Sequence, residues 1–161
     1  MKNQPLLIFT AALLFAAGSS ARALDFPSMG FQIDPLETSP SSPPTQALML
    51  FLPAESGFAP NVNVVIQPYG GTREDYIKLS KGQFDQMELK IISEKTPSDN
   101  EWICEYSGDL QGSLLHWYAR AILASGKVYL VTATSRDANW AAVSDPLKKC
   151  VDSFKIDSSK K

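Results

Sequence analysis

Residues 102–154 constrain the fold more than any other part of this chain, because three strand-like segments follow one another there before a helical pattern begins. The strand-like segments are residues 102–107, 113–123 and 127–134. Gly108, Gly112 and Gly126 mark the two short connections between them. Connections of this kind are typical of β-hairpins. The block therefore predicts three antiparallel strands followed by a helix.

The turn positions also predict which side chains share a face of the sheet, since residues two apart point the same way and cross-strand partners share a face. One face is expected to be wholly apolar, with Trp117, Ala119 and Ala121 beside Tyr129, Val131 and Ala133. The opposite face is expected to be mixed, with Leu114, His116, Tyr118, Arg120 and Ile122 beside Val128, Leu130 and Thr132. Both faces are too apolar to stay in water, so each requires a cover.

An apolar stripe at offsets of three and four follows the third strand and consists of Trp140, Val143, Leu147, Val151 and Phe154. Such a stripe indicates a helix that packs on a sheet. Pro146 interrupts it, and proline is tolerated only in the first turn of a helix. We therefore expect a short turn at 137–143 and a helix from about 145 to 154 that is capped by Ser144 or Asp145.

The chain before this block supplies further elements, with short strands predicted at 48–52, 61–67 and 88–94. Thr72 heads a helix, and Asp75 three residues later completes a capping box. The prediction is an α+β fold, a mainly antiparallel sheet of about six strands covered by helices. It extends over residues 47–156 and is followed by a polar tail, 157–161.

Residues 1–23 have the three regions of a secretory signal peptide: Lys2, an apolar run at 6–17, and Ala21-Arg22-Ala23 before the cleavage point. The apolar run is shorter than the roughly 20 residues that span a bilayer. We expect cleavage after Ala23, a secreted or periplasmic protein, and no transmembrane segment in the mature chain. An uncleaved membrane anchor is the alternative.

Residues 24–46 are rich in proline and serine, a composition that favours an extended arm or linker. The chain has 15 Lys and Arg against 17 Asp and Glu. Cleavage removes Lys2 and Arg22, which leaves 13 against 17 and a net charge near −4. A mildly acidic domain has no basic surface for a polyanion, so we expect no nucleic-acid partner.

The residue types that catalysis requires are sparse. His116 is the only histidine, and no zinc-ligand spacing accompanies it. We therefore expect no catalytic residue, no metal site and no cofactor. An aromatic cluster across the first hairpin is predicted to pack beneath a helix, with a binding surface as the alternative. The candidate ligand-binding or partner-binding residues are Trp102, Tyr106, His116, Tyr118 and Arg120.

Cys104 and Cys150 are the two cysteines, and export to an oxidising compartment permits a disulfide between them. We predict this disulfide, which closes a loop of about 47 residues. The predicted register places Cys104 on the mixed face, and three arrangements stay open. The C-terminal helix covers the mixed face, which we favour, or the first hairpin is displaced by one residue, or the two thiols stay apart as small buried side chains.

The order of these elements resembles that of PsbP-type domains, a superfamily that includes the photosystem II extrinsic protein PsbP, a Ran-binding relative and bacterial envelope proteins of the DcrB kind. The segments that carry the resemblance are 50–53, 61–67, 76–87, 126–134, Trp140 and 151–154. The resemblance covers about residues 47–156 and implies an α/β/α sandwich that binds or assembles rather than catalyses.

With the signal peptide, the resemblance implies an exported, non-enzymatic binding or accessory domain of the bacterial cell envelope with a protein partner. The alternative is a hydrolase or small-ligand carrier with a polar site near His116. A deep pocket with acids converging on His116 or Tyr118 favours the alternative. A shallow surface with one apolar patch favours the binding domain.

Overall fold

The computed structural model describes residues 24–26, 30–33, 45–54 and 57–157, and the chain divides into two compact units, 1–41 and 42–161. In the first unit, β1 (Leu24–Phe26) and β2 (Phe31–Ile33) form an antiparallel hairpin. The predicted signal peptide, most of the predicted arm and the end of the predicted tail lie outside the described residues.

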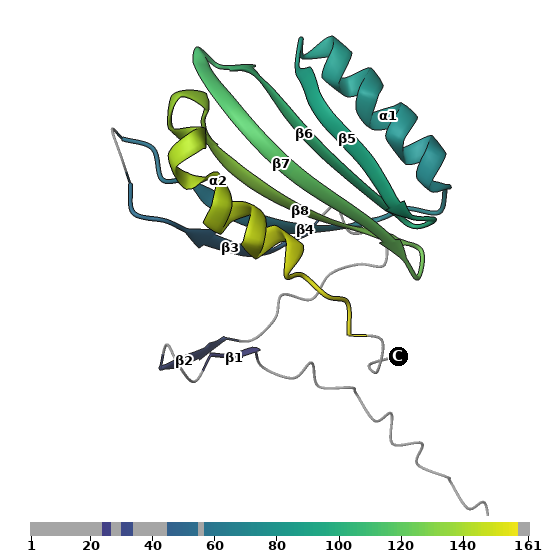
Figure 1. Ribbon diagram of the computed structural model, residues 1–161. Helices are drawn as coiled ribbons and strands as arrows, with labels where there is room; N and C mark the ends of the chain where they lie inside the picture. Colours follow the sequence, from purple (N-terminus) through teal and green to yellow (C-terminus); the bar gives the residue numbers. More distant parts are fainter. Residues whose placement is uncertain (1–23, 27–29, 34–44, 55–56, 158–161) are drawn as a thin grey trace, which may run out of the picture. The chain divides into compact units, whose positions relative to one another are not determined.

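The second unit is a six-stranded sheet with a helix on each face (Figure 1). Its elements are β3 (Thr45–Phe51), β4 (Asn61–Pro68), α1 (Arg73–Gln86), β5 (Lys90–Ser98), β6 (Glu101–Leu110), β7 (Ser113–Ala124), β8 (Lys127–Arg136) and α2 (Asp137–Asp152). All neighbouring strands are antiparallel, in the order β3-β4-β8-β7-β6-β5. The predicted α+β fold is confirmed, and its first strand begins two residues before the predicted boundary at 47.

The capping box predicted for α1 is present. The Asp75 amide donates to Thr72 Oγ1 at 3.1 Å, and the Thr72 amide donates to Asp75 Oδ2 at 3.4 Å. These bonds satisfy amides that have no partner within the helix. They fix where the helix starts, and Tyr76 one turn later is buried against the sheet.

The register predicted for β7 and β8 is wrong by one residue. Their turn contains only Ser125 and Gly126, with φ of 52° and 71°, so that Ala124 pairs with Lys127. Positive φ at both turn residues is the two-residue hairpin geometry that matches strand twist. A shift of one residue moves a whole strand's side chains to the other face. Tyr118, Arg120 and Ile122 therefore share a face with Ala133, Val131 and Tyr129.

Each face of the sheet has its own core. On the α2 face, Val62, Val64, Ile103, Tyr118, Val131 and Ala133 pack with Trp140, Leu147 and Val151. On the α1 face, Trp102, Cys104, Ala121 and Val128 pack with Tyr76. Aromatic rings continue along the α1 face from Tyr76 through Trp102, Phe84 and Tyr106 to Trp117, with neighbouring ring centroids 4.4–6.5 Å apart. Each helix therefore buries the apolar side chains of one face of the sheet, as the composition of the strands requires.

The predicted turn at 137–143 is the first half of α2, which begins at Asp137 and continues through Pro146. A proline inside a helix costs about 3 kcal/mol because it removes one hydrogen bond and crowds the preceding turn. Pro146 has no amide hydrogen to donate to the carbonyl of Ala142. Ala142 is exposed, so water can hydrogen-bond to that carbonyl. Trp140 and Leu147 are buried on either side of the proline, and their packing holds the helix together.

The predicted disulfide is wrong, since Cys104 and Cys150 are both free. Cys104 lies on the α1 face, whereas Cys150 packs against the core of the α2 face. The predicted register of the first hairpin is wrong by one residue, because Cys104 pairs with Ala119 and not with a residue of the predicted mixed face. The helix α2 covers the face of His116 and Tyr118, as favoured, but Cys104 lies on the other face. The sheet therefore separates the two thiols, which stay apart.

The two thiols should differ strongly in reactivity. Burial, followed by the charges of Glu94 and Glu105, raises the pKa of the Cys104 thiol to about 12. Cys104 is only 1% exposed, whereas Cys150 is partly exposed. Titration with a thiol reagent without reductant should modify one thiol in the native protein and a second only in denaturant.

The control is Cys150→Ser, which should abolish thiol modification in the native protein and leave the modification that requires denaturant. Two thiols that react at the same rate in the native protein, or none in denaturant, would contradict this assignment.

Candidate functional site

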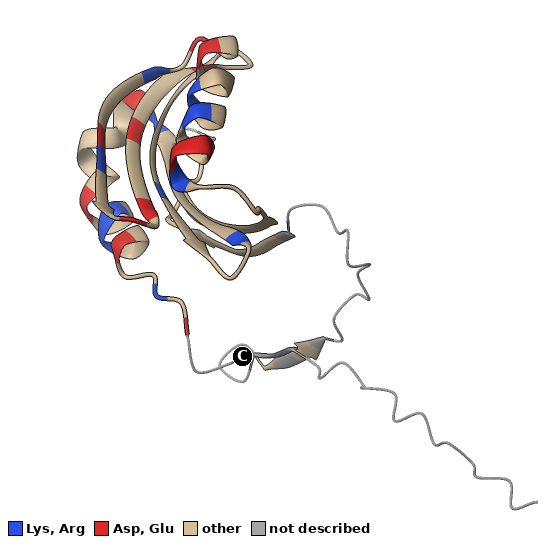
Figure 2. Cartoon of the chain, turned by 90° about the vertical axis from the view of Figure 1, so that its right-hand side faces the viewer, with Lys and Arg blue, Asp and Glu red and all other residues tan. Residues whose placement is uncertain are grey.

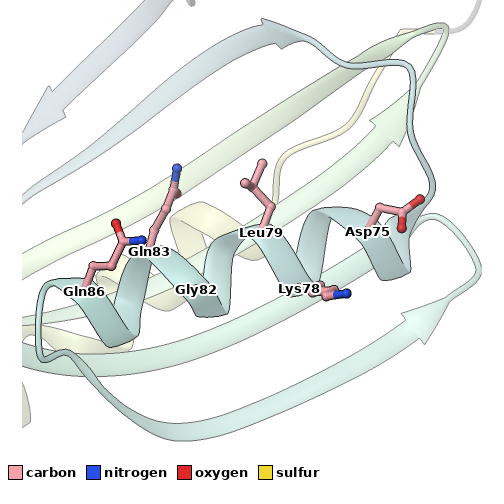
Figure 3. Close-up of a pocket in the computed structure, with 6 residues that line it drawn as sticks. All are labelled: Asp75, Lys78, Leu79, Gly82, Gln83 and Gln86. Atoms are coloured by element: carbon pink, nitrogen blue, oxygen red, sulfur yellow. The ribbon is translucent and has the colours of Figure 1, made fainter.

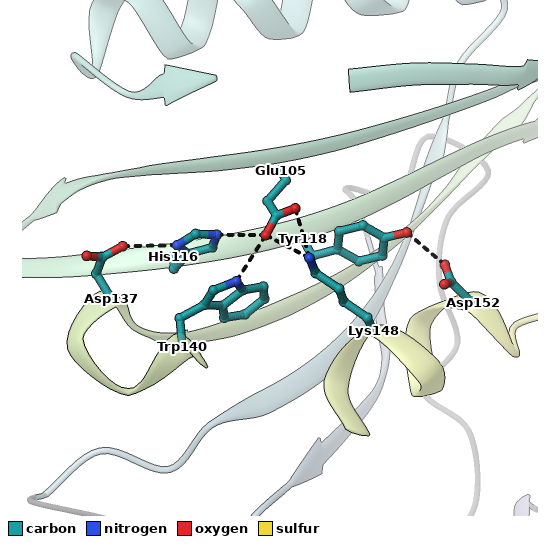
Figure 4. Close-up of polar contacts among 7 residues, drawn as sticks. All are labelled: Glu105, His116, Tyr118, Asp137, Trp140, Lys148 and Asp152. Carbon is teal, nitrogen blue, oxygen red and sulfur yellow. Dashed lines mark hydrogen bonds and ion pairs between the residues drawn. The ribbon is translucent and has the colours of Figure 1, made fainter. Parts of the chain in front are cut away.

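Glu105 of β6 lies at the centre of a polar network between the sheet and α2 (Figure 4). Its carboxylate accepts hydrogen bonds from His116 Nε2 at 3.0 Å, Trp140 Nε1 at 3.0 Å and Lys148 Nζ at 2.9 Å. The side chain is 14% exposed. A carboxylate this far from water is stable only with such a set of donors, one of them charged.

His116 ties the first turn of α2 to β7. Its Nδ1 lies 3.0 Å from Asp137 Oδ1, and its ring stacks on Trp140 with centroids 4.1 Å apart. Carboxylates only accept, so the two contacts of the ring are both hydrogen bonds when both nitrogens carry a proton. Asp137 is in the first turn of the helix, where the helix dipole favours a negative charge.

Tyr118 and Arg120 of β7 hold the other end of α2. The Tyr118 hydroxyl donates to Asp152 Oδ1 at 3.0 Å. Burial, the bond to Asp152 and nearby negative charge raise the pKa of Tyr118 to about 12, so the donor keeps its proton. Arg120 Nη1 donates to the carbonyls of Asp152 and Phe154 at 3.0 and 3.1 Å. These are carbonyls at and beyond the helix end, where no helical donor follows.

The charge state of Glu105 results from two opposed effects. Burial alone would raise its pKa, but the hydrogen bonds from Lys148 and His116, the Lys148 charge and the Trp140 N–H outweigh burial. The pKa of Glu105 is therefore below its ordinary value. The ionised carboxylate is the form that holds the donors together.

The structure divides the five residues that the sequence suggested as a site. Trp102 and Tyr106 lie beneath α1, whereas His116, Tyr118 and Arg120 lie on the α2 face. The aromatic cluster predicted across the first hairpin therefore does not form as a unit. Its members on the α2 face instead join residues that the sequence analysis did not select: Glu101, Glu105, Asp137, Trp140, Lys148 and Asp152.

A serine-hydrolase arrangement is not assembled around His116. Ser135 pairs with His116 across the β7–β8 ladder, but it is 0% exposed and its Oγ has no hydrogen-bond partner among the described residues. Both ring nitrogens of His116 instead contact carboxylates. A triad requires a reachable nucleophile in contact with its base.

A cleft of about 320 Å³ opens beside this network and is lined by Ser93, Glu94, Lys95, Ile103, Glu105, Tyr118 and Lys148. A second hollow of about 390 Å³ lies along α1, where Leu79 projects from the helix beside Gln83 (Figure 3). The cleft is near the lower limit of small-molecule sites, which are about 300–1,000 Å³.

Strands β3 and β4 form a surface without charge. Residues 45–54 and 57–72 contain no Asp, Glu, Lys or Arg, so both strands are tan in Figure 2. Three large apolar side chains of β3 are exposed along this uncharged edge: Leu48 by 45%, Leu50 by 44% and Phe51 by 62%. Leu48 and Leu50 lie on the α2 face, and Phe51 projects from the opposite face beside Asn61. Exposed large apolar side chains mark interaction sites when they adjoin one another.

Within the part of the chain that the structure describes, no three His, Cys, Asp or Glu side chains are grouped to hold a metal ion. In the same residues, no helix has the length and apolar character to cross a membrane.

The PsbP family model matches residues 59–156. A Pseudomonas aeruginosa protein of unknown function, PA94, described as a putative regulator, has a similar structure, with a TM-score of 0.66, 11% identity, and 84% of this chain and 96% of that chain covered. Cyanobacterial PsbP (CyanoP) from Synechocystis sp. PCC 6803 gives a TM-score of 0.48, 12% identity, and coverage of 88% and 96%. No curated protein sequence matches the chain. The likeness to PA94 is one of fold.

Replacing Glu105 by glutamine should destabilise the second unit by about 1–3 kcal/mol at pH 7, because Lys148 and His116 lose a charged acceptor. The pKa of Glu105 is lower in the folded chain than in the unfolded one. Its contribution is therefore complete above about pH 4.5 and is lost as the pH falls through the folded pKa. Urea unfolding at a series of pH values should show the difference between Glu105→Gln and the wild type shrinking in acid.

Asp145→Asn, an exposed position on the same helix, is the control and should change stability by less than about 0.5 kcal/mol. A stability difference for Glu105→Gln that stays constant with pH would contradict a central role for the carboxylate.

Proposed function

Because the chain belongs to the PsbP family, we propose that it is an exported, non-enzymatic binding or accessory domain of the bacterial cell envelope that acts on a protein partner. The polar side chains of the α2 face support this, since both ring nitrogens of His116 contact carboxylates and the Tyr118 hydroxyl donates to Asp152. Export is supported by the signal-peptide pattern of residues 1–23.

The observation that carries the proposal is the uncharged surface of β3 and β4. Phe51 is 62% exposed, and β4 beside it contributes Asn61 and Asn63 rather than charges. Protein-binding patches are depleted of charge at their centre and enriched in aromatic side chains. The partner accordingly presents an apolar segment to Phe51 and polar, uncharged groups to the asparagines.

A small-ligand carrier is the second candidate, and the cleft beside Glu105 is the observation that favours it. Lys148 keeps hydrogen-bonding capacity beyond its bond to Glu105, since an ammonium group has three donors. Lys95 supplies a second cation at this cleft. A ligand of this cleft would carry an anionic group for the lysines and an apolar part for Ile103 and Tyr118.

Export and the carrier alternative are checked in one measurement. The native mass spectrum of exported protein should give a chain that begins at Leu24 and carries no additional mass. Ala23→Phe, which removes the small residue at the cleavage point, should retain residues 1–23. A retained segment in the wild type would contradict the proposed processing, and a bound small molecule that Lys95→Glu removes would favour the carrier.

Photo-crosslinking in producing cells tests the partner surface. A benzophenone side chain at position 51 should yield a covalent adduct with a different protein, because Phe51 is the most exposed large apolar residue of the uncharged surface. The matched control is position 92 on β5, where Ile92 is 49% exposed outside that surface. Adducts of equal yield from both positions, or none from position 51, would contradict the proposal.

A further inference from the structure

The two edges of the six-stranded sheet differ in chemistry. At one edge, β5 contains Lys90, Glu94, Lys95 and Pro97, and its pairing with β6 is interrupted by two register shifts. Charges, proline and bulges are the devices by which an edge strand resists pairing with another chain. The edge at β5 is therefore guarded.

At the other edge, β3 has none of these devices in its second half. The segment from Leu48 to Phe51 has neither charge nor proline, and its pairing with β4 is regular. The one register shift in β3 lies earlier, between Gln46 and Leu48. Its outward backbone groups have no strand beside them among the described residues. An open, apolar edge of this kind is a template for strand addition.

We propose that the β3 edge pairs with β3 of a second copy of this chain, antiparallel and about a two-fold axis, so that the two six-stranded sheets become one. The inference rests on the proposed function, because it uses the same uncharged surface. It assigns the edge of that surface to a second copy and leaves its face to the partner.

Side-chain positions support a second copy as the occupant. Leu48 and Leu50 pair with Val64 and Val62 of β4, so both leucines lie on the α2 face. In a two-fold pairing centred on Met49, Leu48 of each copy lies opposite Leu50 of the other. Apolar pairs across a ladder stabilise it. The leucines thus continue the row of Val62 and Val64, which are 4% and 6% exposed, across the interface.

The absence of charge in β3 also favours pairing with itself. Two copies bring no like charges together, whereas a β5 edge would place Lys90, Glu94 and Lys95 against a second set of charges. Because β3 is the only open edge of the six-stranded sheet among the described residues, pairing uses the same surface on both copies and stops at two. Isologous contacts of this type close into dimers rather than filaments.

Sedimentation of the exported chain at concentrations from roughly 1 to 200 µM should show a dimer that dissociates on dilution. Leu50→Lys should raise the dissociation constant at least about 100-fold, because it places a charge in an apolar cross-strand pair. Its circular dichroism spectrum should stay unchanged, since Leu50 is 44% exposed in the single chain. Ile92→Lys on β5 is the matched control and should sediment like the wild type.

A wild type that remains monomeric over this range would overturn the inference, as would equal weakening by Leu50→Lys and Ile92→Lys. A benzophenone at position 50 of the purified protein supplies a second test without a charge change, and it should give a covalent dimer that position 92 does not give. Adducts with a different protein from position 51 together with a monomeric chain would retain the proposed function and reject the dimer. A dimer without such adducts would retain the dimer and reject the proposed function.

Discussion

The contact on which the packing of α2 depends is the carboxylate of Glu105 with its three donors. The donors come from a strand and from two turns of α2, so a single acceptor fixes the helix in both position and rotation. Apolar contacts alone do not specify such a rotation, because a helix can turn on a flat apolar face at little cost. Buried charges add specificity when every partner is present. Tyr118 and Arg120 complete the arrangement at the end of the helix.

The same network explains why α2 forms in spite of its sequence. Arg136 at the start of the helix provides no side-chain cap, and Pro146 interrupts its hydrogen bonds. Local propensity therefore predicts a later start at 145. The contact of Asp137 with His116 and the burial of Trp140 are tertiary, and they supply the stabilisation that the local sequence lacks. Helix boundaries that depend on tertiary contacts are not visible in a window of sequence.

Most of the fold could be predicted because its signals are local. Strand alternation, glycine turns and the Thr72–Asp75 capping box each depend on residues a few positions apart, and the structure confirms them. The site could not be predicted in the same way. Its composition depends on which residues of three strands share a face, and counting Ala124 as part of the β7–β8 turn exchanged the two faces of β8 relative to β7. A separate error of one residue in the β6–β7 hairpin placed Cys104 on the face of His116 and Tyr118. Cys104 and Cys150 therefore seemed able to meet, and Glu105 was overlooked although it lies opposite Tyr118 in the ladder.

The distribution of charge links this core to the surface. Charged side chains of β6, β7 and α2 pair with one another across the α2 face, and β5 carries its charges at the guarded edge. The β3 and β4 strands are left without charge, although they belong to the same sheet. A change in β3 therefore alters the surface without disturbing the donors of Glu105, since the network lies on β6, β7 and α2. The sheet can keep one internal architecture while its uncharged edge strand adapts to what it contacts, because β4 and β8 lie between β3 and the strands of the network.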